Sequence, residues 1–154
     1  MQLDNLDIGI LTAFQKDCRT SLEQIAKDLG VPKSTIHYRI KRLEEKKIIE
    51  GYYAKVNNEK LGKNFLTITL ARAKYGPHYY EKAGKKIENI PGVWAVYFIF
   101  GENDLLILSR SKNRDEYLQK LDEIMKIPEI ERTNTLVVAK VLKEDIRSSV
   151  ELED

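Results

Sequence analysis

The chain has 154 residues, of which 42% are hydrophobic and 32% are charged, a composition that suits a packed core with a soluble surface. No apolar run approaches the roughly 18 residues that a membrane helix needs, and residues 1–4 do not begin a signal peptide. The single cysteine, Cys18, excludes an intrachain disulfide and a cysteine-based metal cluster. We therefore expect a cytoplasmic protein with no membrane partner.

The net charge of +2 is too small to indicate a nucleic-acid binder, but the charges are unevenly distributed. Residues 32–47 carry six basic side chains against two acidic ones, whereas residues 144–154 form an acidic tail. A basic stripe on one helix is typical of DNA-binding proteins, although ordinary solvated helices also carry such stripes.

The first fifty residues predict three helices. Asp4 is a suitable N-cap for the first, whose apolar residues recur at helical spacing. Ser21 can cap a second, short helix that Gly30 ends. Pro32 suits the first position of a third helix, since its missing N–H costs nothing there. The apolar stripe of this third helix comprises Ile36, Ile40 and Leu43.

From residue 48 the apolar pattern becomes extended, which predicts a strand over 49–56 and a turn-rich linker over 58–64. The later elements follow the order β-α-β-β-α-β of a ferredoxin-like fold. Their expected ranges are a strand at 66–70, a helix near 80–90, strands at 93–100 and 105–109, a helix at 115–127 and a strand at 133–142. The fold class is therefore α+β, with domains at 1–57 and 65–143 and a tail at 144–154.

Two of the predicted strands, 93–100 and 105–108, are apolar at both alternating positions. A ferredoxin-like sheet carries both helices on one face, so its second face needs another cover. We expect a second copy of the chain to cover it. The alternative is that the N-terminal domain folds back over this face.

The third helix has a polar face opposite its apolar stripe. Hydroxyl, imidazole and cationic side chains suit base edges and phosphates in a major groove, and the preceding short helix completes a helix-turn-helix. Arg39 flanks the apolar stripe and is expected to pair within the protein. The alternative is a three-helix bundle with a solvated face. The predicted DNA-contacting residues are Ser21, Lys33, Ser34, Thr35, His37, Tyr38, Lys41 and Arg42.

An ordered series of motifs extends over almost the whole chain. It comprises Leu3-Asp4-x-Leu6-Asp7-x-x-Ile10-Leu11, Asp17-x-Arg19-x-Ser21-x-x-x-Ile25-Ala26-x-x-Leu29-Gly30, Ser34-Thr35-Ile36-x-x-Arg39-Ile40-x-x-Leu43-Glu44, Ile48-Ile49-x-Gly51-Tyr52-x-Ala54, Ile90-Pro91-Gly92-Val93 and Gly101-x-x-Asp104. In this series the chain resembles the Lrp/AsnC, or feast/famine, regulators of transcription in their archaeal form.

The resemblance implies a winged helix-turn-helix joined by a hinge strand to an αβ-sandwich. It also implies a dimer that assembles further, as a tetramer or octamer, and an amino-acid effector bound where dimers meet. Asp104 would accept the effector's ammonium group, or alternatively it is a turn residue that bonds its own backbone. The ligand residues that the resemblance implies are Gly101, Glu102, Asn103, Asp104, Thr133 and Thr135.

Two residues depart from the family pattern. Lys47 stands where the family usually has glycine, at a position expected to be left-handed, so we expect local backbone strain. Gly9 lies inside the first helix, where glycine is unfavourable.

Enzymatic activity is the main rival hypothesis, because some siroheme decarboxylases also resemble this family. The only histidines are His37 and His78, and the sequence contains no phosphate loop, nucleophile–base pair or metal-ligand spacing. We therefore expect no cofactor and no enzyme. An architectural DNA binder without an effector is a second alternative.

Overall fold

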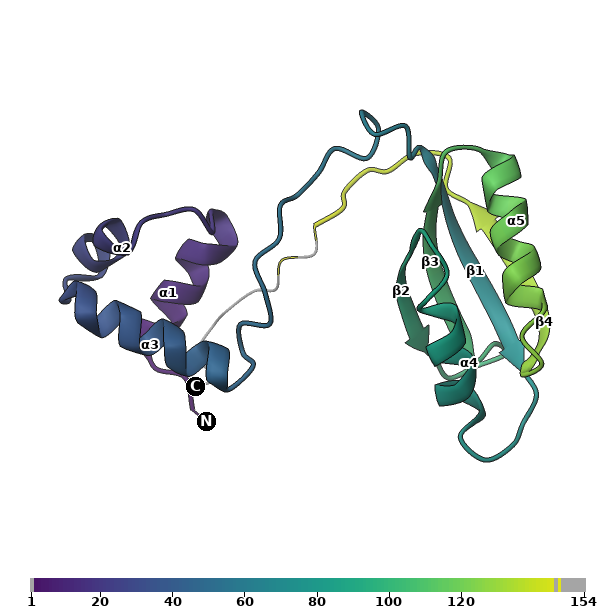
Figure 1. The fold of residues 1–154 in the computed structure, drawn as a ribbon, viewed down its shortest axis with the longest axis horizontal. Helices are drawn as coiled ribbons and strands as arrows, with labels where there is room; N and C mark the ends of the chain where they lie inside the picture. Colours follow the sequence, from purple (N-terminus) through teal and green to yellow (C-terminus); the bar gives the residue numbers. More distant parts are fainter. Residues whose placement is uncertain (1, 146, 148–154) are drawn as a thin grey trace. The chain divides into compact units, whose positions relative to one another are not determined.

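The computed structural model describes residues 2–145 and 147 (Figure 1). Within these residues the chain forms two compact units. One unit comprises residues 2–55 with 144, 145 and 147, and the other comprises residues 56–143. The predicted linker, 58–64, begins the second unit with a run of turns that includes the left-handed Gly62.

Three helices form the first unit: α1 (Asn5–Lys16), α2 (Leu22–Leu29) and α3 (Lys33–Glu45). The expected caps are confirmed, since Asp4 and Ser21 accept backbone hydrogen bonds at the starts of α1 and α2, and the left-handed Gly30 ends α2. Pro32 occupies the N-cap of α3, one position before the predicted one. Local chemistry therefore determines where each of these helices begins.

The core of the first unit joins one apolar stripe from each helix. Ile10, Ile25, Ile36 and Leu43 are at most 1% exposed. A Cβ on Gly9 would lie only 2.6 Å from a methyl carbon of Leu29, so glycine here permits α1 and α2 to approach each other. The close approach explains a residue that helix propensity alone disfavours.

The predicted strand over 49–56 is not formed. In the described part of the chain, no backbone hydrogen bond pairs residues 50–56 with another segment. A strand needs a neighbour for its N–H and C=O groups, and a single chain provides none here. The expected hinge strand is therefore only an exposed segment, in which Tyr52 packs edge-on against Phe14 at 5.5 Å.

The second unit is an antiparallel sheet with the strand order β2-β3-β1-β4, which confirms the ferredoxin-like prediction. All four strands differ from their expected ranges. Strands β1 and β3 are longer than expected. Strand β2 ends at residue 98 because residues 99–104 form the turn to β3, and β4 extends over 130–137, with Ile130 paired to Ala73. The elements are β1 (Phe65–Ala73), α4 (Tyr79–Ile87), β2 (Val93–Phe98), β3 (Leu105–Ser111), α5 (Arg114–Met125) and β4 (Ile130–Val137).

Both helices of this unit pack on one face of the sheet. Ile87 of α4 and Ile124 of α5 join Ala71, Leu105 and Ile107 in a single core. The strand register places apolar residues in two rows across the opposite face. One row is Leu136, Ile68, Leu108 and Ala95, and the other is Asn134, Leu70, Leu106 and Tyr97. Within this unit, the second face therefore has no helix to cover it.

Candidate functional site

The outer face of α3 carries polar side chains that the sequence predicts to contact DNA. Four of its exposed members are Ser34, His37, Tyr38 and Lys41. Their spacing of three and four residues places them on one side of the helix, opposite the buried Ile36, Ile40 and Leu43. Thr35 is half-buried at the edge of this face. We call this surface the α3 polar face.

Two further residues of the predicted set have partners within the protein. The Ser21 hydroxyl accepts a hydrogen bond from the backbone N–H of Gln24 at 3.2 Å. The Lys33 ammonium forms an ion pair with Glu23 that lowers the pKa of the Glu23 carboxyl. Both residues lie where a helix begins, at the N-cap of α2 and at the first residue of α3. Helix N-termini also present N–H groups that suit phosphates.

An ion network joins the start of α1 to α3. The Asp7 carboxylate is fully buried, and it accepts hydrogen bonds from Arg39 at 3.1 Å and from Arg42 at 2.8 Å. Arg39 also donates to Asp4, whose carboxyl pKa is lowered first by the Asp7 backbone N–H and then by Arg39. The internal pairing that we expect for Arg39 is therefore confirmed.

Arg42 belongs to the predicted DNA-contacting set, but in the structure one of its terminal nitrogens binds Asp7. Its Nε is buried and has no hydrogen-bond partner among the described residues. The sequence analysis did not identify Asp7 as a structural residue. A usable signal was present, because Asp7 shares a helical face with the apolar Ile10 and Leu11 and so places an acid within a buried stripe.

The exit of α3 has the geometry expected at Lys47. This residue is left-handed, with φ of 55°. The Lys47 N–H bonds the carbonyl of Glu44 and the Ile48 N–H bonds the carbonyl of Leu43, both at 2.9 Å. The two bonds form a Schellman motif, in which glycine is the usual left-handed residue.

The carboxylate of Asp104 has two structural partners. It accepts hydrogen bonds from the Ala73 backbone N–H at 2.8 Å and from the Tyr79 hydroxyl at 3.0 Å, and Asp104 is only 7% exposed. It thus fixes the turn before β3 to the end of β1 and the start of α4. The structure does not show the alternative, in which the Asp104 carboxylate bonds the backbone of its own turn. Both groups that donate to this carboxylate lie on other elements.

The other predicted ligand residues are exposed or half-buried. Gly101 and Glu102 are exposed, Asn103 is half-buried, and Glu102 pairs with Arg132 at 2.8 Å. Asp104 and Thr133 lie on either side of Ala71, because the Asp104 N–H bonds the Ala71 carbonyl and Thr133 pairs with Ala71 across the sheet. The end of the sheet thus brings the turn close to Thr133.

Thr135 lies one step further along β4, on the face that carries the helices. Its hydroxyl bonds the Thr69 hydroxyl at 3.1 Å and also bonds the hydroxyl of Tyr117. The Thr133 hydroxyl donates to the sulfur of Met125 at 3.5 Å. Both threonines are half-buried, and both hydroxyls have partners within the second unit.

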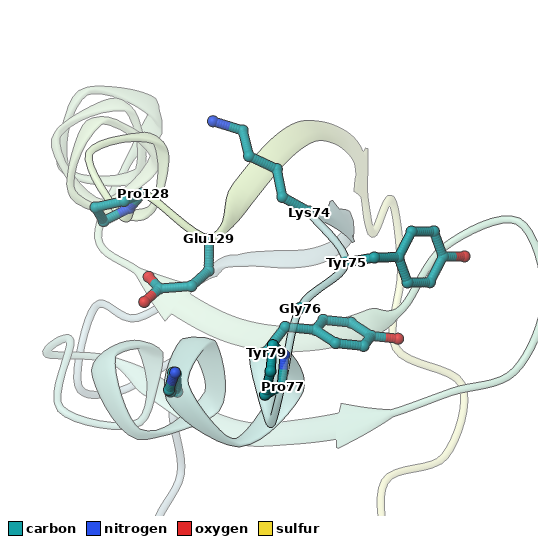
Figure 2. Close-up of a pocket in the computed structure, with 8 residues that line it drawn as sticks. Lys74, Tyr75, Gly76, Pro77, Tyr79, Pro128 and Glu129 are labelled. Atoms are coloured by element: carbon teal, nitrogen blue, oxygen red, sulfur yellow. The ribbon is translucent and has the colours of Figure 1, made fainter.

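An open cavity of about 220 Å³ lies at this same end of the sheet, between the segment after β1 and the segment before β4 (Figure 2). Its lining includes the cations of Lys74 and Lys82 and the carboxylate of Glu129, whose two oxygens bind Lys86 at 2.7 and 2.8 Å. The Lys86 bond lowers the pKa of the Glu129 carboxyl. Figure 2 shows Tyr79 extending away from Glu129, so these side chains do not converge on one point. No motif in the sequence indicates this cavity.

Among the described residues, no helix is long and apolar enough to cross a membrane. Residues 2–145 and 147 likewise contain no group of three or more His, Cys, Asp or Glu side chains that could hold a metal ion. The features that could carry function are thus the α3 polar face, the second face of the sheet and the turn at residues 101–104.

Comparison with known proteins identifies both units. Residues 3–44 match the AsnC-type helix-turn-helix domain, and residues 65–147 match the Lrp/AsnC ligand binding domain. The HTH-type transcriptional regulator FL11 of Pyrococcus furiosus is 39% identical over 142 residues, which cover 92% of this chain and 93% of that protein.

Solved structures agree with this assignment. E. coli AsnC has a TM-score of 0.86 at 28% identity, with 98% of this chain and 100% of that chain covered. The feast or famine regulatory protein of M. tuberculosis, solved in complex with L-methionine, has the same fold, with a TM-score of 0.87 at 23% identity and coverage of 97% and 99%. The chain belongs to the Lrp/AsnC family of transcriptional regulators.

Proposed function

We propose that this protein is a sequence-specific DNA-binding regulator whose oligomeric state or DNA affinity responds to a small amino-acid effector. The observation that carries the proposal is the α3 polar face, which presents hydroxyl, imidazole and ammonium groups while the opposite side of the helix is fully buried. Its partner is double-stranded DNA, which places its work in the cytoplasm.

Within the α3 polar face, we assign base readout to Ser34, His37 and Tyr38, with Thr35 at the edge, and phosphate contact to Lys41. Ser21 and Lys33 reach phosphates from the starts of their helices. Arg42 contributes its second terminal nitrogen while Asp7 holds the first. A side chain that is already held in place loses less conformational entropy on binding.

The protein acts as a dimer that buries the second face of the sheet. The two rows across that face contain only one polar residue, Asn134, and the face has no helix of its own. A dimer also presents two α3 helices, which suits half-sites about 10 base pairs apart. Higher assembly, to a tetramer or octamer, would then multiply the number of reading helices.

The effector is proposed to be a free amino acid bound at the turn formed by residues 101–104, at a surface shared between dimers. The matched ligand-binding domain and the L-methionine complex of the M. tuberculosis relative support this class of ligand. An ionised carboxylate has about four acceptor sites, and Ala73 and Tyr79 use two of those on Asp104. The others can accept from the ligand's ammonium, and the turn amides can donate to its carboxylate. The Thr133 and Thr135 hydroxyls can donate to the same carboxylate if they exchange their present partners, Met125, Thr69 and Tyr117, for the ligand.

Regulation then follows from linkage. A ligand that contacts two dimers binds the assembled state better than the separate dimers and so shifts the population toward assembly. An architectural protein would bind DNA in the same way but would ignore amino acids.

The first experiment tests α3. Duplexes enriched from random sequence by the full-length protein serve as target DNA, and binding is followed by fluorescence anisotropy at several salt concentrations. Lys41→Ala should weaken binding to every duplex roughly threefold to tenfold and reduce the salt slope by about 0.9 for each protomer, since one phosphate contact is lost. Tyr38→Ala should mainly reduce the preference for enriched duplexes over random ones.

Lys85→Ala, which removes an exposed lysine of α4, is the matched control and should bind like the parent. If Lys41→Ala and Tyr38→Ala also bind like the parent, α3 is not the reading helix.

A further inference from the structure

The exit of α3 carries a residue whose backbone conformation its side chain disfavours. Lys47 is left-handed in the Schellman motif, where its Cβ crowds the following carbonyl and where glycine meets no such penalty. Residues held in sparsely populated backbone regions concentrate at functional sites, so an observed outlier warrants a search for a role.

Packing does not explain a lysine at this position. Lys47 and its neighbour Lys46 are exposed, and within the described chain neither forms an ion pair or hydrogen bond through its ammonium group. A cation does suit a helix C-terminus, but Lys46 at the C-cap already supplies one. In the absence of a partner, the Lys47 side chain therefore adds little stability to the folded protein beyond what Lys46 already provides.

The acidic groups at this end of α3 are occupied within the protein. Glu44 accepts a hydrogen bond from the Tyr52 hydroxyl at 2.9 Å, and Glu45 lies 3.9 Å from the Lys41 ammonium. Neither bond involves Lys46 or Lys47. The helix exit therefore presents two ammonium groups that have no acidic partner among the described residues.

The exit of α3 lies at the opposite end of the helix from the residues that would contact base edges. At 13 residues the helix is about 20 Å long, so its two ends are far enough apart to meet different parts of the DNA. With the N-terminal part of α3 at the base edges, the other end extends over the groove wall, where the DNA presents phosphates.

We propose that Lys47 is a phosphate-binding residue and that its backbone strain is retained because the side chain contacts the DNA backbone. The inference rests on the proposed reading role of α3 and extends the interface past the end of that helix. The proposed interface also extends past residue 44, where the match to the AsnC-type helix-turn-helix domain ends. The contact is electrostatic, so it strengthens binding to all sequences equally.

Three substitutions in the full-length protein separate strain from binding. Lys47→Gly relieves the strain and removes the charge, so the thermal midpoint should rise by roughly 2–5 °C while DNA affinity falls roughly threefold to tenfold. Lys47→Asn, which tolerates the left-handed region, should weaken binding to a similar extent. Lys47→Arg keeps the charge and should bind within about twofold of the parent, with the same salt slope.

The measurement is fluorescence anisotropy on a labelled duplex of arbitrary sequence and on an enriched duplex, at four or more salt concentrations, together with thermal unfolding. The salt slope for Lys47→Gly should be lower by about 0.9 per protomer on both duplexes. Lys60→Gln, at an exposed turn of the second unit, is the control and should change neither property.

If Lys47→Gly is stabilised but binds both duplexes with the parental affinity and slope, the lysine is only a tolerated cap and the inference is wrong. A loss of binding to the enriched duplex alone would also overturn it, because a phosphate contact is blind to sequence. Failure of the parent itself to bind DNA would instead refute the proposed function.

Discussion

The two units differ in how completely a single chain covers their apolar surfaces. In the first unit the buried Asp7 carboxylate has two arginine partners, and three helices close the core around Ile10, Ile25 and Ile36. In the second unit the buried polar groups are also paired, as when Lys120 donates to the Arg110 carbonyl and the Ser111 hydroxyl, both at 2.9 Å. However, two rows across one face of its sheet, apolar except for Asn134, have no covering helix.

The difference indicates how reading and sensing are divided. The first unit needs no partner to present α3, so a change within it should act on DNA binding or on its own stability. The second unit leaves apolar area uncovered on the second face of its sheet, which we also call the open face. A change on this face should therefore act on assembly. Each of the following predictions tests one side of this division.

The largest effect is expected on the open face. Leu106 lies at the centre of one row, between Leu70 and Tyr97. Leu106→Glu would bury a charge in the proposed dimer interface, a cost that assembly cannot recover without a partner group. We expect a monomer at micromolar concentration in sedimentation and at least a hundredfold loss of affinity for a two-half-site duplex.

Leu118→Glu is the matched control, because Leu118 is 42% exposed on α5, on the other side of the sheet. It should sediment like the parent. A dimeric Leu106→Glu protein with unchanged circular dichroism would show that the open face is not the interface.

A smaller effect is expected from Asp7 in the first unit. Asp7→Asn removes the charge that two arginines share, and breaking a buried pair typically costs 3–5 kcal/mol. Both arginines are partly exposed, with side chains at 22% and 30%, so we expect a loss of about 2 kcal/mol. The first unit should therefore unfold at lower urea concentration.

The single tryptophan makes this prediction specific to one unit. Trp94 lies on β2 in the second unit, so its fluorescence should report a transition that Asp7→Asn does not move. Far-ultraviolet circular dichroism should show the helices of the first unit unfolding earlier. Asp17→Asn, at an exposed carboxylate, serves as the control. Equal shifts by both probes would contradict the independence of the two units.

Sequence analysis identified what local chemistry determines. Caps at Asp4, Ser21 and Gly30 each depend on residues within a few positions, and all were predicted. The left-handed conformation of Lys47 was expected from the family resemblance instead. The order of strands was also predictable, because alternating apolar residues and the two turn-bounded helices leave few arrangements.

The strand wrongly predicted over 49–56, and the contacts that the sequence did not predict, concern partners that are distant in the sequence. The segment 49–56 has a strand pattern but no neighbour to pair with, which the pattern itself cannot reveal. Arg42 binds Asp7 from 35 positions away, and Asp104 binds Ala73 from 31 positions away. Side-chain type indicates that a group seeks a partner, but only the fold determines which partner it meets.

The smallest effect is expected at Asp104, where structure and proposed sensing overlap. Asp104→Asn keeps an oxygen that can accept from Ala73 but removes the negative charge offered to an ammonium group. We expect amino-acid binding by the full-length protein to weaken about fivefold to tenfold, because a hydrogen bond to a charged group contributes about 1.5–3 kcal/mol and part of it survives in the amide. DNA affinity without ligand should stay within twofold of the parent, since the turn belongs to the second unit.

Amino-acid binding is measured by calorimetry with each of the twenty amino acids on the parent and on Asp104→Asn. Tyr79→Phe is the control, because it removes a structural donor to the same carboxylate and leaves the charge in place. Tyr79→Phe should therefore retain most of the binding. If no amino acid binds the parent at millimolar concentration, the sensing role is wrong. If binding is equal in the parent and in Asp104→Asn, the carboxylate serves only to hold the turn.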